Sequence, residues 1–265
     1  MIATRASLGA DVRALGIRGG DAVMVHAACG SVGTILGGPD ALVDAILDVV
    51  GPSGTVLSYQ DWELGLDIWG PDGTVAVDIR PHVPPFDPST ARAARDHGIL
   101  ASTIGTRPGV LRSANPGASV AALGAGADEF TRDHPLDDGY GRDSPFARLV
   151  RAGGRVLMIG APLDTMTVLH HAEALADVPA KRRVRREYPF RGPDGETVWR
   201  WSEEFDTSDP VVAGLDDDYF ATVVREFLAT GAGARGLVGL AESVVVDAGP
   251  ITAFGIDWLE RHAAR

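Results

Sequence analysis

The stretches Ala22-Val-Met-Val-His26 and Thr55-Val-Leu-Ser-Tyr59 are short apolar runs on either side of one amphipathic segment. Apolar runs of this length, bounded by glycine turns, are typical of buried strands. Between them, Pro39 begins a segment in which apolar residues recur at helical spacing from Ala41 to Val49. A strand, a loop, a helix and a second strand in this order favour parallel pairing and predict an α/β fold.

Further strands and helices are predicted along the rest of the chain from the same apolar patterns. The clearest central strand is 155–160, and residues 183–190 and 196–202 flank a Pro-Asp-Gly turn that predicts an antiparallel hairpin. Residues 60–90 are irregular. We therefore expect one α/β domain over residues 1–265, with a central mixed, largely parallel sheet flanked by helices and a small inserted antiparallel hairpin. The other predicted helices are 4–15, 89–106, 125–132, 146–151, 165–176, 216–230 and 250–261, and the other predicted strands are 120–124, 235–239 and 243–247.

The charge balance excludes some classes of partner. The chain has 24 basic and 36 acidic residues, a net charge of −12. This charge repels nucleic acid and anionic membranes, and it attracts cationic ligands, although many soluble proteins are equally acidic. Cys29 is the single cysteine, which suits a reducing compartment, and no apolar run is long enough for a membrane span. We expect a cytoplasmic protein, a monomer or a homodimer, with no nucleic-acid or membrane partner.

A histidine and a glutamate follow the central strand, in Thr167-Val-Leu-His-His-Ala-Glu173. Ligands in open α/β sheets bind beyond the carboxyl ends of strands. His170 and Glu173 are three residues apart, so they share one helix face, and a carboxylate there holds an imidazole ready to act as a general base. The alternative is a packed histidine beside a solvated glutamate. Because His170 and His171 point about 100° apart on a helix, we expect no metal site.

Two further regions are candidates for binding. The glycine-rich loop from Ala28 to Gly38 exposes backbone N–H groups to anions, although it fits neither the dinucleotide nor the ATP phosphate-loop pattern and is equally consistent with a plain connection. Cys29 in this loop lacks an activating base other than His26. Asp61 and Glu63, together with Glu203, Glu204, Asp206 and Asp209, are carboxylates that either bind a polyamine together or form solvated surface.

In combination, these motifs resemble one known family, the aminoglycoside 3-N-acetyltransferases, which are distinct from the GCN5-type acetyltransferases. The resemblance covers nearly the whole chain in order. Two departures stand out: Ala28 lies where the family usually has serine, and Asn115 lies where it usually has histidine. The matching stretches are Asp21 to His26, Ser31 to Gly33, Gly37-Gly38, Gly54-Thr55, Pro85 to Pro88, Arg112-Ser113 with Pro116, Ser144-Pro145, Leu157 to Ala161, Thr167 to Glu173, Glu204 to Asp206 and Ile251 to Leu259.

The resemblance implies transfer of an acetyl group from acetyl-CoA to the 3-amino group of the deoxystreptamine ring of aminoglycoside antibiotics, which gives antibiotic resistance. It implies that His170 is the general base and that Glu173 orients it. It places Glu204 and Asp206 as carboxylates that support the base or the substrate, and Asp61 and Glu63 as acids facing the antibiotic. The residues it places along the CoA path are His26, Ala28, Ser31, Val32, Gly33, Arg112, Ser113 and Ser144.

The sequence is also consistent with three other functions. The same fold could acylate another amine metabolite, a metal-dependent hydrolase would use His170 and His171, and a non-catalytic binding protein would leave the histidine and glutamate without a role. For the transferase we expect direct attack of the amine on the thioester, without an acyl-enzyme intermediate.

Overall fold

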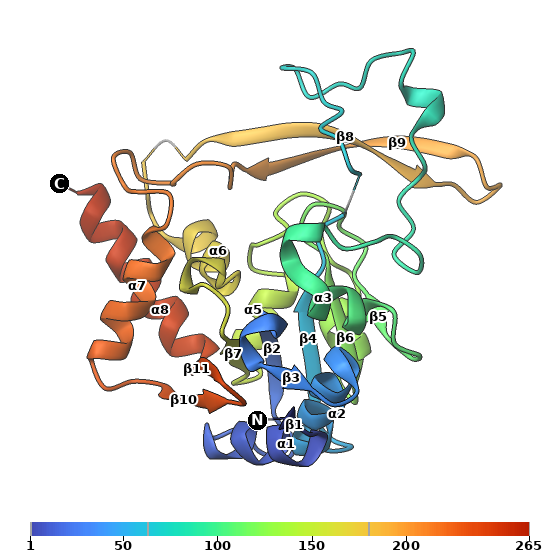
Figure 1. Ribbon diagram of the computed structural model, residues 1–265. Coiled ribbons are helices and arrows are strands. Elements are labelled where there is room, and N and C mark those ends of the chain that lie inside the picture. Colours follow the sequence, from blue (N-terminus) through green and yellow to red (C-terminus); the bar gives the residue numbers. More distant parts are fainter. Residues whose placement is uncertain (1, 63, 180, 265) are drawn as a thin grey trace.

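A seven-stranded mixed sheet forms the centre of the computed structural model, which describes residues 2–62, 64–179 and 181–264. Its order is β10-β11-β7-β2-β4-β6-β5 (Figure 1). The three central strands β7, β2 and β4 are parallel, and the outer pairs are antiparallel. The strands are β2 (Ala22–Ala27), β4 (Thr55–Tyr59), β5 (Leu111–Arg112), β6 (Val120–Gly124), β7 (Arg155–Ile159), β10 (Ala234–Val238) and β11 (Ala241–Asp247).

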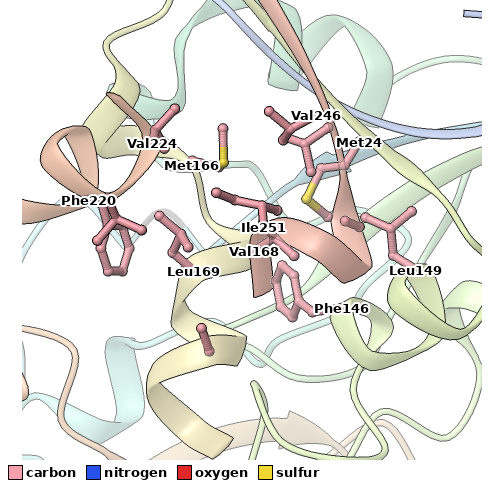
Figure 2. Packing of buried hydrophobic residues seen from close by; sticks show 14 of the residues in the cluster. Met24, Phe146, Leu149, Met166, Val168, Leu169, Phe220, Val224, Val246 and Ile251 are labelled. Carbon is pink, nitrogen blue, oxygen red and sulfur yellow. The ribbon is translucent and has the colours of Figure 1, made fainter. Parts of the chain in front are cut away.

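Helices cover both faces of this sheet, and alternate strand residues supply the two cores. Met24 and Met158 pack with one set of helices, as the close view in Figure 2 shows for Met24, while Val25 and Leu157 pack with the other. The first set is α4 (Ala127–Thr131), α5 (Pro145–Arg151), α6 (Val168–Leu175), α7 (Tyr219–Ala229) and α8 (Ala248–Ala263). The second set is α1 (Arg5–Ala14), α2 (Gly38–Val50) and α3 (Gly98–Gly105).

A two-stranded hairpin, β8 (Arg183–Arg191) and β9 (Thr197–Phe205), extends across one end of the molecule in Figure 1. The irregular segment after β4, which includes η2 (Arg80–His82), packs against it. Trp69 Nε1 donates to the carbonyl oxygen of Glu187 at 2.7 Å, and the buried Glu187 carboxylate accepts from Arg80 and from the N–H of Val75, each at 2.7 Å. The hairpin and the long loop therefore form one layer above the sheet.

Short elements complete the fold near the carboxyl ends of the central strands. Strand β2 leads into η1 (Cys29–Val32), then β3 (Thr34–Ile35), which pairs with β1 (Ile2–Ala3). Strand β7 leads through η4 (Leu163–Thr165) into α6. Thr4 caps α1 in a capping box with Ser7, which explains why this helix begins where the sequence predicts it.

The predicted mixed sheet, flanking helices and hairpin are confirmed, with parallel pairing confined to the three central strands. The predicted helix 89–106 is wrong in its first part, because helical structure starts only at η3 (Arg95–His97) and continues as α3. Ser89 is bonded to the Asp87 carboxylate in a turn, and the N–H of Ala94 donates to the carbonyl oxygen of Asp61. Pairing with the long loop therefore replaces the first helical turns.

Candidate active site

The side chains of His170 and Glu173 are in direct contact on α6. His170 Nδ1 and Glu173 Oε2 are 2.5 Å apart, and the glutamate side chain is only 3% exposed whereas the histidine is 25% exposed. The second glutamate oxygen accepts a hydrogen bond from the Tyr219 hydroxyl at the start of α7. Burial, followed by the glutamate's negative charge, raises the pKa of Tyr219, so this hydroxyl stays a donor. The contacts from Tyr219 to Glu173 and from Glu173 to His170 fix the imidazole ring, and they leave its Nε2 available to accept a proton.

His171, the next residue on the helix, points away from this chain of contacts. Its Nδ1 lies 2.6 Å from the carbonyl oxygen of Tyr140, and burial lowers its pKa. The two histidines thus lie on different faces, as their adjacency predicts. Within the described ranges, no three His, Cys, Asp or Glu side chains are grouped so that they could hold a metal ion.

His170 faces a cavity of about 400 Å³ at the carboxyl ends of β2 and β7. His26 and Ala28, both predicted on the CoA path, line it together with Tyr59 and His97. Burial and the nearby His97 lower the pKa of His26 to about 4, so His26 is neutral at physiological pH. Its Nε2 is buried without a hydrogen-bond partner among the described residues.

Ser31 and Val32 lie in η1 and Gly33 follows it, and all three are outside the lining of that cavity. The Ser31 hydroxyl donates to the carbonyl oxygen of Ala28 at 2.7 Å, and the residue is exposed. Val32 is buried in the core, and Gly33 has a positive φ of 90° and lies against Leu240. Of the three, Ser31 has a polar side chain at the surface.

Arg112, Ser113 and Ser144, which are predicted to lie along the CoA path, form hydrogen bonds with the protein's own backbone. Arg112 donates to the carbonyl oxygens of Ala91 and Gln60, each at 2.6 Å, and so fastens the long loop. The Ser113 hydroxyl accepts from the N–H of Val120, and the Ser144 hydroxyl accepts from the N–H of Ala147 as the cap of α5. Both serines are fully buried, and none of the three residues lines a cavity beside His170. These hydrogen bonds support the long loop, β6 and the start of α5, and contact with CoA stays a prediction for all three residues.

A second cavity, of about 580 Å³, lies between the long loop and the hairpin. Asp61, Glu204 and Asp206 line it as the sequence predicts, and Tyr59 and Asp96 line both this cavity and the one that contains His170. Glu63, predicted to face the same ligand, lies outside the described residues. The cavity with the acids and the cavity with His170 therefore adjoin at Tyr59 and Asp96.

The two hairpin carboxylates differ in their electrostatic environment. Burial raises the pKa of Glu204 to about 7, although its oxygens accept hydrogen bonds from the N–H groups of Gly139 and Phe205. Burial also raises the pKa of Asp206, but hydrogen bonds from Ser208 and the charge of Arg182 outweigh it and lower the pKa overall. Asp206 is a permanent anion, whereas Glu204 changes charge near neutral pH.

Sequence reasoning missed several residues of the site. Tyr219 reaches Glu173 from 46 positions along the chain, and Tyr140 packs 5.1 Å from the His170 ring. His97 falls inside the helix predicted for 89–106, yet its ring centroid lies 4.7 Å from that of Tyr59 beside the cavity. Asn115, which differs from the family pattern, accepts the N–H groups of Gly117 and Ala118 through Oδ1 and shapes the loop.

The sequence profile of a family described as aminoglycoside 3-N-acetyltransferase matches residues 24–260. The chain belongs to the aminoglycoside 3-N-acetyltransferase family. It is accordingly an acetyltransferase, as its sequence resemblance implies.

Individual relatives cover nearly its whole length. It is 45% identical to aminoglycoside N(3)-acetyltransferase III of Pseudomonas aeruginosa, over 97% of this chain and 93% of that one. It is 42% identical to aminoglycoside N(3)-acetyltransferase VII of Streptomyces paromomycinus, over 99% of this chain and 93% of that one.

Solved structures of aminoglycoside acetyltransferases also match this chain over nearly its whole length. The structure of AAC-IIIb in binary complex with CoASH matches with a TM-score of 0.96 at 60% identity, covering 98% of this chain and 97% of that one. AAC-VIa bound to sisomicin matches with a TM-score of 0.92 at 37% identity, covering 99% of this chain and 100% of that one.

Among the described residues, the helices are too short or too polar to span a lipid bilayer.

Proposed function

We propose that this protein transfers the acetyl group of acetyl-CoA to the 3-amino group of the deoxystreptamine ring of aminoglycosides, with His170 as the general base, and so gives antibiotic resistance. The observation that carries the proposal is the contact of 2.5 Å between His170 and Glu173, with His170 in a cavity that shares Tyr59 and Asp96 with the acidic cavity. The CoA-bound and sisomicin-bound relatives support the two ligand classes. We place the reaction in the cytoplasm, in keeping with the single cysteine.

The reaction is a direct attack in this proposal. The amine nitrogen bonds to the thioester carbonyl carbon while His170 Nε2 takes a proton from the nitrogen. The tetrahedral intermediate then collapses, the carbon–sulfur bond breaks, and the CoA sulfur leaves as a thiolate that takes the proton from His170. Glu173 stabilises the imidazolium between the two steps, and Tyr219 holds the carboxylate in place.

A covalent route through Cys29 is disfavoured. Burial raises the pKa of its thiol, which lowers the fraction of the nucleophilic thiolate. In the described residues, the cavity that holds His170 is lined by Ala28 but not by Cys29. Cys29 therefore lies outside the cavity that contains the proposed base.

The intermediate also needs donors for its oxyanion. The N–H groups of Ala28 and Ser31 already donate to the carbonyl oxygens of Ile159 and Ala28. We therefore seek the donors among the other N–H groups of the loop from Ala28 to Gly38, which follows the end of β2. Ser31 and the backbone of Val32 and Gly33 extend this surface as the path for the rest of CoA.

On the other side of His170, Asp61, Glu204 and Asp206 bind the ammonium groups of the antibiotic. Carboxylates that hold a polycation position the one amine that must react, which is an entropic contribution to catalysis. Trp62 and Trp69 supply flat apolar walls in the same cavity. This arrangement assigns a role to part of the net charge of −12.

An acceptor panel tests the proposal. Free-thiol release from acetyl-CoA is measured with kanamycin, gentamicin, spermidine and a set of primary-amine metabolites, and the product is located by NMR. Turnover confined to the aminoglycosides, with the new amide at the 3-position, is expected. Turnover with another amine and none with the aminoglycosides would instead identify an N-acyltransferase of a different metabolite.

A further inference from the structure

One arginine lies among the carboxylates of the cavity between loop and hairpin. Five acidic side chains line this cavity in the described residues, and Arg186 is the single lysine or arginine there. A pocket for a polycation would be expected to exclude a guanidinium, because the two repel each other. The acids are Asp61, Asp67, Asp96, Glu204 and Asp206.

The register of the hairpin explains how Arg186 reaches the cavity. Side chains alternate between the two faces of a strand, and Val184, Arg186 and Tyr188 of β8 all line the cavity. Their partners across the hairpin include Glu204, opposite Val184, and Ser202, opposite Arg186. Arg185 is exposed and stacks over Trp201 with its guanidinium carbon 4.1 Å from the ring centroid, and it does not line the cavity.

Arg186 is held in place without losing its charge. Its guanidinium carbon lies 5.0 Å from the centroid of the Trp69 ring, and its positive charge acts on the buried Tyr188 hydroxyl on the same face of the strand. It makes no ion pair with any acidic side chain of the described chain, in contrast to Arg182 and Arg183 on the same hairpin. A positive charge with no acidic ion-pair partner among the described residues therefore faces the cavity.

We propose that Arg186 is a specificity-determining residue that favours aminoglycosides presenting a hydroxyl, rather than an ammonium group, to its guanidinium. This inference rests on the proposed function. The guanidinium N–H groups donate to a sugar hydroxyl, which is a good acceptor, whereas an ammonium group has no lone pair and carries the same charge.

Two pairs of antibiotics isolate this difference. Kanamycin A and kanamycin B differ by a hydroxyl or an amine at the 2′ position, and paromomycin and neomycin B differ in the same way at the 6′ position. We measure kcat/KM for all four with wild type, Arg186→Gln and Arg186→Met, which both remove the charge. Arg186→Lys keeps the charge, and Arg185→Gln removes a charge from the outer side of the same strand.

In at least one pair, the ratio of kcat/KM for the amino member to that for the hydroxyl member should rise by about threefold or more in both neutral Arg186 variants. Arg186→Lys and Arg185→Gln should keep the wild-type ratios within about twofold. Unchanged ratios in both pairs, or an equal loss with all four antibiotics, would overturn the inference. Failure of the wild type itself to acetylate any of the four would instead overturn the proposed function, and the inference with it.

Discussion

The residues of the site differ in how directly the sequence reveals them. The spacing of His170 and Glu173 predicts a shared helix face, and the contact of 2.5 Å confirms that they meet. Tyr219 has no such signal, because its contact with Glu173 depends on how α7 packs on α6. Arg112 shows the opposite case: its position in a family motif implies a ligand contact, and the structure shows three hydrogen bonds within the protein, to the Ser119 hydroxyl and to the carbonyl oxygens of Ala91 and Gln60.

Glu204 carries a prediction at the residue scale. Its pKa of about 7 leaves the carboxyl largely protonated at pH 6 and ionised at pH 8 in the free protein. An ammonium group binds better to the ionised form, so affinity for kanamycin should rise as the pH increases through 7. Isothermal titration at pH 6, 7 and 8 measures this effect.

Glu204→Gln provides the control, because it keeps the size of the side chain and cannot ionise. Kanamycin's own amines lose charge over the same range in both proteins, so the relevant quantity is the ratio of the two affinities. That ratio should increase about threefold or more from pH 6 to pH 8. A constant ratio would show that Glu204 does not contact the antibiotic as an anion.

At the scale of elements, strands with clear apolar runs and helices with strong periodicity are predictable. The sequence locates β2, α2, β4 and β7 to within about two residues, which is the usual uncertainty of element ends. The two-residue strands β1, β3 and β5 have no such pattern, because two residues cannot show a period. The segment 89–94 departs from its apparent helical pattern because the long loop offers its backbone other partners.

The contacts of Glu187 test how much the packing of the hairpin against the long loop contributes to stability. Glu187→Gln weakens a carboxylate that holds both Arg80 and the N–H of Val75, and Glu187→Ala removes it. The alanine variant should lower the free energy of unfolding by about 2–4 kcal/mol, since Arg80 then loses a buried partner. Urea unfolding followed by tryptophan fluorescence measures this change.

The matched control is Glu203→Ala on the same hairpin. Glu203 pairs with Arg183 where both side chains are about half exposed, so its loss should cost less than about 1 kcal/mol. Equal destabilisation by both variants would contradict the view that Glu187 fastens the long loop.

The whole molecule combines a strongly acidic charge with a cavity between two layers. Because exposed and partly exposed charges are screened by salt, the KM for kanamycin should rise by about threefold or more between 50 and 500 mM NaCl. The KM for acetyl-CoA, an anion, provides the internal control and should not rise in parallel. A kanamycin KM that stays constant over this range would mean that the acids do not contribute to binding.

The central claim is that His170 is the base for acetyl transfer to the antibiotic. The most direct measurement is the single-turnover rate of kanamycin acetylation with saturating acetyl-CoA, compared between wild type, His170→Ala and His82→Ala. His82 is exposed and lines none of the cavities beside His170, so its variant controls for the loss of a histidine. We predict a fall of at least about 100-fold for His170→Ala and a wild-type rate for His82→Ala. A His170→Ala rate within threefold of the wild-type rate would contradict the account.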